Sequence, residues 1–532
     1  MKKEYLSAIF ALFSLASFGQ STAQVDANNV NATIQDDGFF FNNSQTASSG
    51  YEVPAGSGIH AIYTGSFWFA GKDVNGQLLL AAQQFESNGA DYTAGPTTRY
   101  ADQYQDAALS TSYFGQTIWE VTKAEIDDHI ANFSSSTYTM PNDIANWPAH
   151  GDTTLGSSSG MLPFIAPFVD VNGNGTYDPA NGDYPCIKGD LAVYTIMNDA
   201  GLHFGSSGQP INMELHFMFY QYTSIPELEN TTFIDVEVVN MGTQTLFDTR
   251  ASFFLDPDLG NYNDDYIGTD TTRNMVYVYN ADDFDFPNMG QQGYGSAPPA
   301  VGMKVLSHEL SASISYTNAG VAPMIPPSQP AEYYFAMNGD YADNSSQLDG
   351  NGNPTDFAYA GDPNVLQSWS EYQQSTVPGD RRFVASLDAG VFGPDFSQGA
   401  SDRRSYSYAV IYARGTDHLN SVAELQSAAD FVQNHYDNMM NNCFDSQVAQ
   451  LSEETNMEFT VSPNPTNGEF TIDWPAEEAA TVEIFDAQGR KVHVRAIYSG
   501  KNLMKLILKS GVYFVNINSE RGAAMQRLIV RQ

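Results

Sequence analysis

The sequence predicts a mostly β protein, with one or two antiparallel β-sandwich-like domains that carry two short helices, followed by a small β-sandwich at the C-terminal end. Aromatic residues make up 13% of the chain and charged residues 16%, below the roughly 25% of ordinary soluble domains. Glycine, asparagine, serine and threonine are frequent, which suits short strands joined by many turns. Several segments also alternate apolar and polar residues at the period of a half-buried strand.

The length and the charge narrow the classes of function. A chain of 532 residues has room for roughly three to four domains. Its net charge of −39 comes from 62 acidic and 23 basic residues, and this field repels phosphate backbones and anionic membrane faces. We therefore expect no nucleic-acid partner.

The first residues have the three zones of a secretory signal peptide. Lys2 and Lys3 are followed by an apolar stretch over residues 5–18 and by small residues up to Ala23. This pattern predicts a signal peptide over residues 1–23, cut after Ala23, with Ser21 two positions before it. The apolar stretch is shorter than the roughly 20 residues that span a bilayer, and we expect no transmembrane segment in the mature chain.

Five segments of the body are expected to form strands. Residues 58–71 and 78–82 are apolar and flank a turn that contains Asn75-Gly76, which predicts a β-hairpin. Strands are also expected within residues 211–222 and 233–239, because apolar and polar side chains alternate there. Residues 406–413 are expected to form another strand.

Two capping boxes predict helices. Thr122 precedes Glu125 by three residues, and Ser421 precedes Glu424 by three, the spacing of reciprocal side-chain and backbone hydrogen bonds at a helix start. Apolar residues recur at helical spacing after each box. In the second helix we expect them to face a core, and they are Val422, Leu425, Ala429, Val432 and Tyr436.

The charge distribution changes sharply near the C-terminal end. Residues 458–532 hold nine basic and eight acidic residues, so the rest of the chain carries about −40. We divide the mature chain into a β-rich region at 24–200, a second β-rich region at 201–445 that ends in a helix, a polar linker at 446–457 and an independent module at 458–532. The two cysteines, Cys186 and Cys443, permit one long-range disulfide or two buried thiols.

The C-terminal module contains four motif blocks in order. They begin at Ser462-Pro463-Asn464-Pro465, Asp486-Ala487-Gln488-Gly489-Arg490, Ser510-Gly511-Val512-Tyr513 and Arg527-Leu528-Ile529-Val530. Prolines fix an extended entry and glycines supply turns between alternating segments, as in a small antiparallel sandwich. The motif residues are Pro463, Asn464, Pro465, Gly468, Asp486, Gly489, Arg490, Gly511 and Arg527.

This arrangement closely resembles the type A C-terminal sorting domain of type IX secretion cargo, a seven-stranded Ig-like sandwich. The resemblance implies recognition by the outer-membrane secretion machinery and removal of the domain by a sortase-like protease. The mature protein would then be released outside the cell or anchored at the cell surface.

Four blocks in the body resemble uncharacterised regions of other proteins with this tail. They are Tyr51-Glu52-Val53-Pro54, Asp256-Pro257-Asp258-Leu259-Gly260, Asp264-Asp265-Tyr266-Ile267-Gly268 and Asp380-Arg381-Arg382. No biochemical role follows from this resemblance.

Residues 170–183 form a calcium-type loop. Oxygen-bearing side chains stand at its first, third, fifth and ninth positions and a glycine, Gly175, at its sixth, the spacing with which a tight loop surrounds calcium. Asn181 takes the place of the bidentate glutamate of an EF-hand, so the loop is closer to thrombospondin-type or dockerin-type loops. The predicted ligands are Asp170, Asn172, Asn174, Thr176 through its carbonyl, Asp178 and Asp183. An asparagine-rich turn that binds no ion is the alternative.

A second acidic cluster follows the apolar run at residues 253–255. Its carboxylates are costly to bury without a cation, and they are Asp256, Asp258, Asp264, Asp265 and Asp270. We interpret the cluster as a metal site or a solvated loop ahead of a catalytic carboxylate pair.

Other motifs are weaker. Residues 349–356 repeat the loop spacing with Pro354 at the turn position, residues 156–160 match a nucleophile elbow without its strand and helix, and no histidines stand at zinc-ligand spacing. Two functions remain. The first is a non-catalytic, calcium-stabilised surface or secreted β protein that binds glycan or protein in adhesion. The second is a secreted polysaccharide hydrolase that uses the Asp256–Asp270 cluster.

Overall fold

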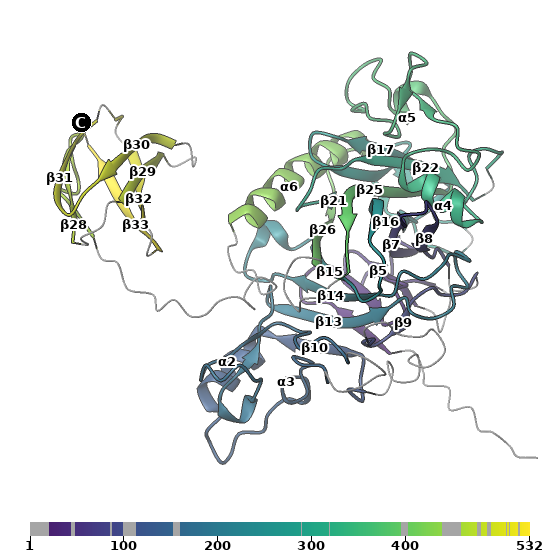
Figure 1. The fold of residues 1–532 in the computed structure, drawn as a ribbon. Coiled ribbons are helices and arrows are strands. Elements are labelled where there is room, and N and C mark those ends of the chain that lie inside the picture. The colour runs from purple at the N-terminus through teal and green to yellow at the C-terminus, as the bar shows by residue number, and fades with distance from the viewer. Residues whose placement is uncertain are drawn as a thin grey trace, which may run out of the picture. The chain divides into compact units, whose positions relative to one another are not determined.

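Two large antiparallel sheets form the main part of the chain, and two smaller sheets form its C-terminal part (Figure 1). The computed structural model describes residues 21–43, 48–85, 88–98, 113–152, 160–288, 290–318, 320–394, 403–438, 459–475, 480–486, 491–506, 508–509, 511–519 and 522–531. The chain divides into two compact units, residues 1–447, here called the body, and residues 448–532, here called the tail unit. The prediction of a mostly β protein is confirmed.

The larger sheet of the body has nine strands in the order β10-β13-β14-β15-β26-β21-β18-β17, with β9 paired to β13. The strands are β9 (Thr93–Ala94), β10 (Ile118–Thr122), β13 (Leu191–Asn198), β14 (Met213–Gln221), β15 (Thr231–Asn240), β17 (Asp265–Asp270), β18 (Met275–Asn280), β21 (Ala300–Val305) and β26 (Arg403–Ala413). The predicted strands at 211–222, 233–239 and 406–413 are thus confirmed as β14, β15 and β26. Every residue of β14 and β15 is buried, so charged side chains in these strands need partners inside the protein.

The second sheet has five strands in the order β22-β25-β16-β7-β8. They are β7 (Thr64–Lys72), β8 (Leu78–Ala81), β16 (Leu246–Asp256), β22 (Ala312–Thr317) and β25 (Arg381–Phe392). β7 and β8 form the predicted hairpin around Asn75-Gly76. The Asp73 carboxylate holds this turn by accepting hydrogen bonds from the amides of Asn75 and Gln77, both at 2.8 Å.

Shorter strands complete the body. A four-stranded sheet joins β1 (Thr22–Val25), β2 (Asn31–Gln35), β5 (Tyr51–Glu52) and β6 (His60–Ile62). The two-stranded pairs are β3 (Asn42–Asn43) with β4 (Ser48–Ser49), β11 (Phe168–Val169) with β12 (Tyr184–Pro185), β19 (Phe284–Asp285) with β20 (Gly295–Ser296), and β23 (Gln347–Leu348) with β24 (Pro354–Thr355).

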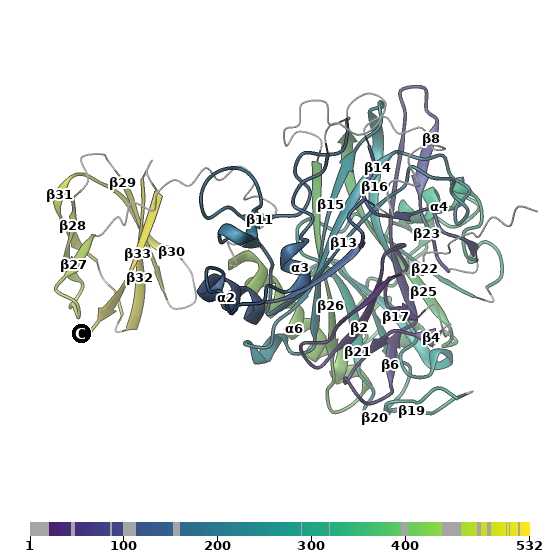
Figure 2. The same cartoon turned by 90° about the horizontal axis from the view of Figure 1, so that it is seen from below.

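The main core lies between the two large sheets, which Figure 2 shows in layers. Alternate residues of each sheet enter it, such as Phe217 of β14 and Phe253 of β16, while their neighbours Met218 and Phe254 pack into separate clusters on the outer faces. β13 and β14 lie on either side of residue 200 and pair along their length. Residues 24–200 and 201–445 therefore share one sheet and one core.

Helices cover the outer faces of the sheets. α2 (Lys123–Asn132) begins with the predicted capping box of Thr122 and Glu125, and α6 (His418–Asn438) packs its predicted apolar stripe on the nine-stranded sheet. α6 starts three residues before Ser421, because Asp417 caps it by accepting from the Asn420 amide at 2.7 Å. The other helices of the described residues are α3 (Asn142–Ala145), α4 (Pro330–Met337), which covers the five-stranded sheet, and α5 (Glu371–Gln374).

The tail unit is a sandwich of a three-stranded and a four-stranded sheet. The first contains β27 (Thr460–Ser462), β28 (Glu469–Trp474) and β31 (Gly500–Lys505), and the second β29 (Ala480–Asp486), β30 (Lys491–Ile497), β32 (Gly511–Ser519) and β33 (Gly522–Val530). Trp474, Ile484 and Val515 lie in its own core. Of the predicted motif residues, Gly489 and Arg490 lie outside the described residues, as do the predicted linker at 446–457 and residues 1–20 of the predicted signal peptide.

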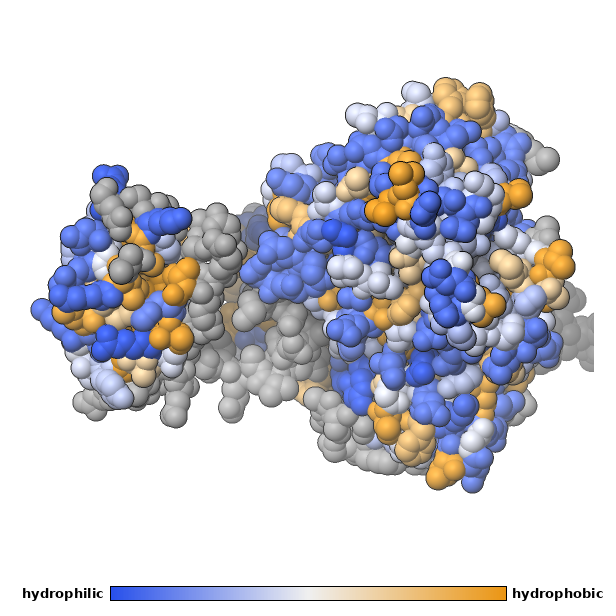
Figure 3. Space-filling model, turned by 90° about the horizontal axis from the view of Figure 1, so that it is seen from above, coloured by the Kyte–Doolittle hydropathy of each residue, from blue (hydrophilic) through white to orange (hydrophobic). Residues whose placement is uncertain are grey.

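The surface is largely polar. Hydrophilic residues predominate on the face of the body drawn in Figure 3, and hydrophobic residues are scattered among them. Among the described residues, no helix combines the length and apolar character needed to cross a bilayer. Cys186 is disulfide-bonded, while Cys443, the other cysteine of the chain, lies outside the described residues.

Separate cores predict separate unfolding. Phe217 is fully buried, with its ring 4.9 Å from that of Phe40 and 6.0 Å from that of Phe67, and truncating such a side chain costs about 3–5 kcal/mol. We expect Phe217→Ala to lower the midpoint of the body transition in calorimetry and to leave that of the tail unit unchanged. Trp474→Ala should do the reverse, and one transition that shifts with both variants would contradict this prediction.

Candidate functional site

Two of the sequence blocks meet where β16 ends and β25 begins. Leu255 pairs with Phe383 across these strands, so the next residues in each direction, Asp256 and Arg382, face each other. Side chains alternate along a strand, which puts Asp256 and Arg382 on the outer face of the five-stranded sheet. The Arg382 guanidinium donates to the Asp256 carboxylate over 3.2 Å.

Three carboxylates converge at this point. Asp256, Asp258 and Asp380 each offer one oxygen within 4.8 Å of the other two. Asp256 and Asp258 are 2% and 8% exposed. The Gln291 amide donates to Asp258 over 3.2 Å, and Arg382 Nη1 lies 3.6 Å from Asp380. We call Asp256, Asp258, Asp380 and Arg382 the triad site; its position is set by the strand register and by the short chain after β16.

The triad site has more polar groups than the hydrogen bonds among its residues satisfy. One oxygen each of Asp256 and Asp380, and Nε and Nη1 of Arg382, are buried without a hydrogen-bond partner. Burial raises the pKa of Asp256 well above its ordinary value, although Arg382 opposes this. Burial and the charge of Asp380 raise the pKa of Asp258 to about 7.

The charge count and the donor type favour one class of ligand. Three ionised carboxylates and one guanidinium leave two negative charges, which one divalent cation would balance. Carboxylate oxygens are the preferred ligands of calcium and magnesium. The triad site can therefore hold a divalent cation.

A second set of buried carboxylates lies beside the triad site. Asp265 accepts from the Leu259 amide at 3.2 Å, and Asp285 accepts from the amides of Asn261 and Tyr294. Burial raises the pKa of Asp264 to about 6, that of Asp285 to about 7 and that of Asp265 well above its usual range. A Cβ at Gly260, which has φ +68°, would collide with the Asp285 carboxylate, so only glycine fits there.

The four blocks singled out in the sequence come together here. The Tyr294 hydroxyl donates to the Val53 carbonyl at 2.8 Å and so ties the block at residues 51–54 to Asp285. Asp270 is the predicted residue that lies apart, at the far end of β17, where it pairs with Arg273 at 2.8 Å. Asp285 and the roles of Asp380 and Arg382 were not predicted, because strand register brings them to the site from distant parts of the chain.

The predicted residues of the calcium-type loop lie close together. Other groups of the loop donate hydrogen bonds to their carboxylates. Asp170 accepts from the amides of Gly173, Asn174 and Gly175 at 2.6–3.2 Å. The carboxylate of Asp178 accepts from the side-chain amides of Asn172, Asn174 and Asn181 at 2.8–3.1 Å. Asp183 is fully buried and accepts from the amides of Val171 and Asp178.

The bonding pattern has opposite effects on two loop carboxylates. Hydrogen bonds from Asn181 and Asp183 lower the pKa of Asp178, whereas burial raises the pKa of Asp183. The loop thus adopts a turn of the kind that binds cations. Its carboxylate oxygens already accept hydrogen bonds from N–H groups of the same loop.

A third group with metal-ligand chemistry lies at the start of α6. Asp283, Asp417 and His418 each offer one ligand atom within 4.8 Å of the others. His418 Nδ1 lies 2.5 Å from an oxygen of Asp283, which is exposed, and Asp417 caps the helix. This group could not be predicted from the sequence, because Asp283 is far from the helix in the chain.

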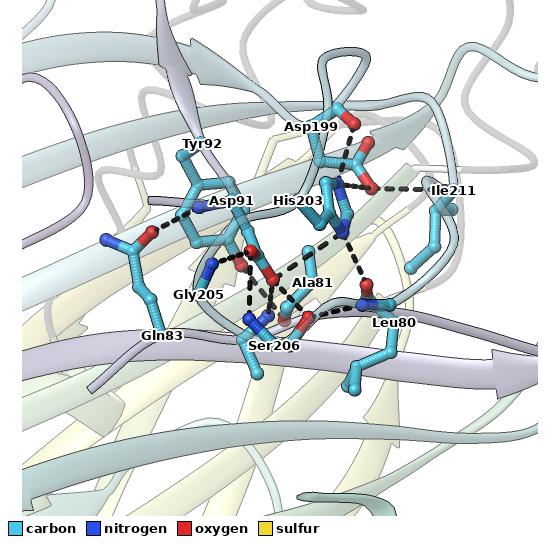
Figure 4. Close-up of polar contacts among 12 residues, drawn as sticks. Leu80, Ala81, Gln83, Asp91, Tyr92, Asp199, His203, Gly205, Ser206 and Ile211 are labelled. Atoms are coloured by element: carbon cyan, nitrogen blue, oxygen red, sulfur yellow. Dashed lines mark hydrogen bonds and ion pairs between the residues drawn. The ribbon is translucent and has the colours of Figure 1, made fainter. Parts of the chain in front are cut away.

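Elsewhere the body matches its buried charges with partners. His203 lies among Asp91, Asp199 and two carbonyls (Figure 4). Its Nδ1 is 2.8 Å from the Leu80 carbonyl and its Nε2 is 2.9 Å from the Asp199 carbonyl. A carbonyl only accepts hydrogen bonds, so a ring nitrogen that carries a proton donates to the carbonyl beside it. Burial raises the pKa of Asp199, and the neighbouring His203 offsets part of this effect.

His216 is held in a similar way on β14. Its ring lies 2.8 Å from Glu214 and 3.1 Å from Glu237, and Arg403 donates to Glu237 at 3.0 Å. These residues form a matched group of two acids and two bases on the outer face of the nine-stranded sheet.

Comparison with known proteins identifies one part of the chain. Residues 460–531 match the model of the secretion system C-terminal sorting domain, so the tail unit is a type IX secretion sorting domain, and the chain is exported across the outer membrane to the cell surface or the medium. No curated protein matches the chain.

Two solved structures share 10% sequence identity with the chain. One is a polysaccharide lyase, with a TM-score of 0.18, 60% of this chain covered and 34% of the lyase, so the chain spans about a third of the lyase's length. The other is a BSP domain of a biofilm-associated protein, with a TM-score of 0.13 and coverages of 84% and 82%. Neither similarity is close enough to support an argument about function.

The His216 group predicts a pH dependence of stability. Burial lowers the pKa of His216, but hydrogen bonds with Glu214 and Glu237 outweigh it and raise the pKa above its ordinary value. The stability from protonated His216 is therefore fully present below about pH 6.5, the ordinary value for histidine, and is lost as pH rises through the raised folded-state pKa. His216→Gln should remove this part of the slope of unfolding free energy against pH.

The same variant should also be less stable at pH 6, because removing one partner of a buried ion pair typically costs about 3–5 kcal/mol. Chemical denaturation at pH 6 to 9 measures both effects. Asp248→Asn, at a side chain that is 70% exposed, is the control and should keep the wild-type slope between pH 6 and 9. An unchanged slope in His216→Gln would refute the assignment.

Proposed function

We propose that this type IX secretion cargo is a non-catalytic binding or adhesion protein whose body is stabilised by calcium. The observation that carries the proposal is the convergence of Asp256, Asp258 and Asp380 on one buried point. Three carboxylates brought so close repel one another unless protons or a cation neutralise them. A calcium ion at the triad site would neutralise the surplus charge and use the oxygens that lack hydrogen-bond partners.

The location of the triad site favours this function over hydrolysis. A glycosidase places two carboxylates on either side of a bound sugar, in a cleft open to the substrate. Two hollows among the described residues, of about 500 and 480 Å³, are lined by other residues such as Glu120 and Lys304. The hypothesis that the acidic cluster belongs to a hydrolase is therefore the weaker alternative to a calcium-stabilised binding protein.

We also propose that the loop at residues 170–183 is a second, weaker calcium site. Its Asp170, Asp178 and Asp183 lie in one turn, but binding an ion there competes with N–H bonds that the loop already makes. We expect an affinity in the range of extracellular calcium modules, about 10⁻⁴–10⁻³ M.

If the triad site binds calcium, the effect of Asp258→Asn on the unfolding midpoint of the body should have opposite signs with chelator and with calcium. Asp258→Asn removes one negative charge, so in a chelator it should raise the unfolding midpoint of the body by relieving repulsion. In calcium the wild type should instead be the more stable protein, because a ligand at 100 times its Kd adds about 2.7 kcal/mol. Calorimetry of the full mature chain, with calcium and with chelator, measures both arms.

Asp248→Asn is the matched control, since its side chain is 70% exposed and its loss should change neither arm. A midpoint that is the same with calcium and with chelator in the wild type would overturn the proposal. So would an Asp258→Asn variant that is destabilised equally in both.

The loop is tested by counting bound ions. Isothermal titration with calcium should give two sites in the wild type and one in the double variant Asp170→Ala and Asp178→Ala, while Asp258→Asn should lose the other site. Asp349→Ala is the control, because Asp349 closes a similar turn with bonds from Asn351 and Asn353. If the loop variant keeps two sites, residues 170–183 form a turn that holds itself without an ion.

A further inference from the structure

The first strand of the body includes residues on both sides of the predicted signal-peptide cleavage point. β1 spans Thr22–Val25, and all four residues pair with β2, from Thr22 opposite Gln35 to Val25 opposite Ala32. Cleavage after Ala23 would cut this strand in the middle.

Ala23 and Ser21 have their own contacts in the body. The Ala23 side chain packs against the main core between the sheets. The Ser21 amide donates to the Asp36 carboxylate at 3.3 Å, and the Thr117 hydroxyl donates to the same oxygen at 2.5 Å. Asp36 is 6% exposed, so loss of the Ser21 donor would leave a buried carboxylate with fewer partners.

We propose that signal peptidase cuts before β1, between Gly19 and Gln20, so that the mature chain keeps the whole strand. Signal peptidases require small residues directly before the cut and two positions further back, and Gly19 and Ser17 meet this requirement. Water cleaves the Gly19–Gln20 peptide bond, the Gly19 carbonyl carbon gains the hydroxyl, and the Gln20 nitrogen becomes the new amino terminus. The new terminus carries a positive charge and precedes Ser21 by one residue in the chain.

This start fits the physical role of the strand. A mature chain beginning at Gln24 would retain two of the four β1 residues and expose the backbone groups of β2 that Thr22 and Ala23 pair with. A chain beginning at Gln20 retains the pairing and the Ser21 bond to Asp36. The inference depends on export of the chain and is independent of the proposed calcium sites.

The test is the identity of the first residue of the processed protein. The full precursor is expressed with its own signal in a Gram-negative host, and the processed chain is examined by intact mass and N-terminal sequencing. We expect Gln20 as the first residue; Gln24 would overturn the proposal. Gly19→Leu should block processing at this position, whereas Ala23→Leu should leave the first residue unchanged, and the reverse pattern would overturn it as well.

A second measurement tests the structural reason and does not depend on processing. Two full-length mature chains are made that start at Gln20 and at Gln24, and the unfolding midpoints of their bodies are compared. We expect the shorter chain to melt several degrees lower. In Asp36→Asn the difference should shrink, because the carboxylate that the longer chain satisfies is gone. Equal midpoints of the two wild-type chains would remove the basis of the proposal.

Discussion

The register between β16 and β25 is the constraint on which the candidate site depends. Leu255 and Phe383 are paired and point into the core between the sheets. A slip of one residue would bring both apolar side chains to the outer face and turn Asp256 and Arg382 into the core. Burial of the core residues thus fixes where the charges lie, and the triad site is the continuation of that register past the end of the hydrophobic strand.

Buried carboxylates elsewhere in the body can accept several hydrogen bonds, whereas Asp256 of the triad site accepts few. Glu371 receives three hydrogen bonds from Arg381, at 2.8–3.3 Å, and Asp91 accepts four bonds, from Ala82, Gly205 and Ser206. Asp256 has one side-chain donor and a second oxygen with none. Asp235, Asp264 and Asp265 also have one buried oxygen without a hydrogen-bond partner, so what distinguishes the triad site is that three carboxylates converge there.

The sequence was informative where one short segment decides the structure. The Asn75-Gly76 hairpin and the Thr122 capping box depend on neighbouring residues, and each is found as predicted. The alternation over residues 233–239 correctly predicted a strand, β15, but not a half-buried one, because both of its faces are covered. The start of α6 was misjudged by four residues, because its cap is Asp417 and not Ser421. Asp417 and Ser421 are both good caps, and the Ser421 hydroxyl is instead used inside the helix to bond the Pro298 carbonyl at 2.7 Å.

The acidic site could be predicted only in part, for a physical reason. Asp256, Asp258, Asp264 and Asp265 are close in the chain, and their crowding was visible without a structure. Asp380 and Arg382 stand more than a hundred residues away, and they enter through a strand pairing that composition does not reveal. Without Arg382 the surplus charge at the site is overestimated, and without Asp380 there is no converging triad. The charge balance of the site is therefore a property of the fold.

The large negative charge of the body also affects how strongly the triad site attracts a cation. About 40 surplus negative charges lie outside residues 458–532, and such a field raises the local concentration of cations around the protein. The same field opposes compaction, so any cation held by specific oxygens relieves two costs, the local repulsion among its ligands and part of the general repulsion. A buried acidic triad without an ion would add to both. A body with this composition gains from a cation at a point where several buried carboxylates converge, as they do at the triad site.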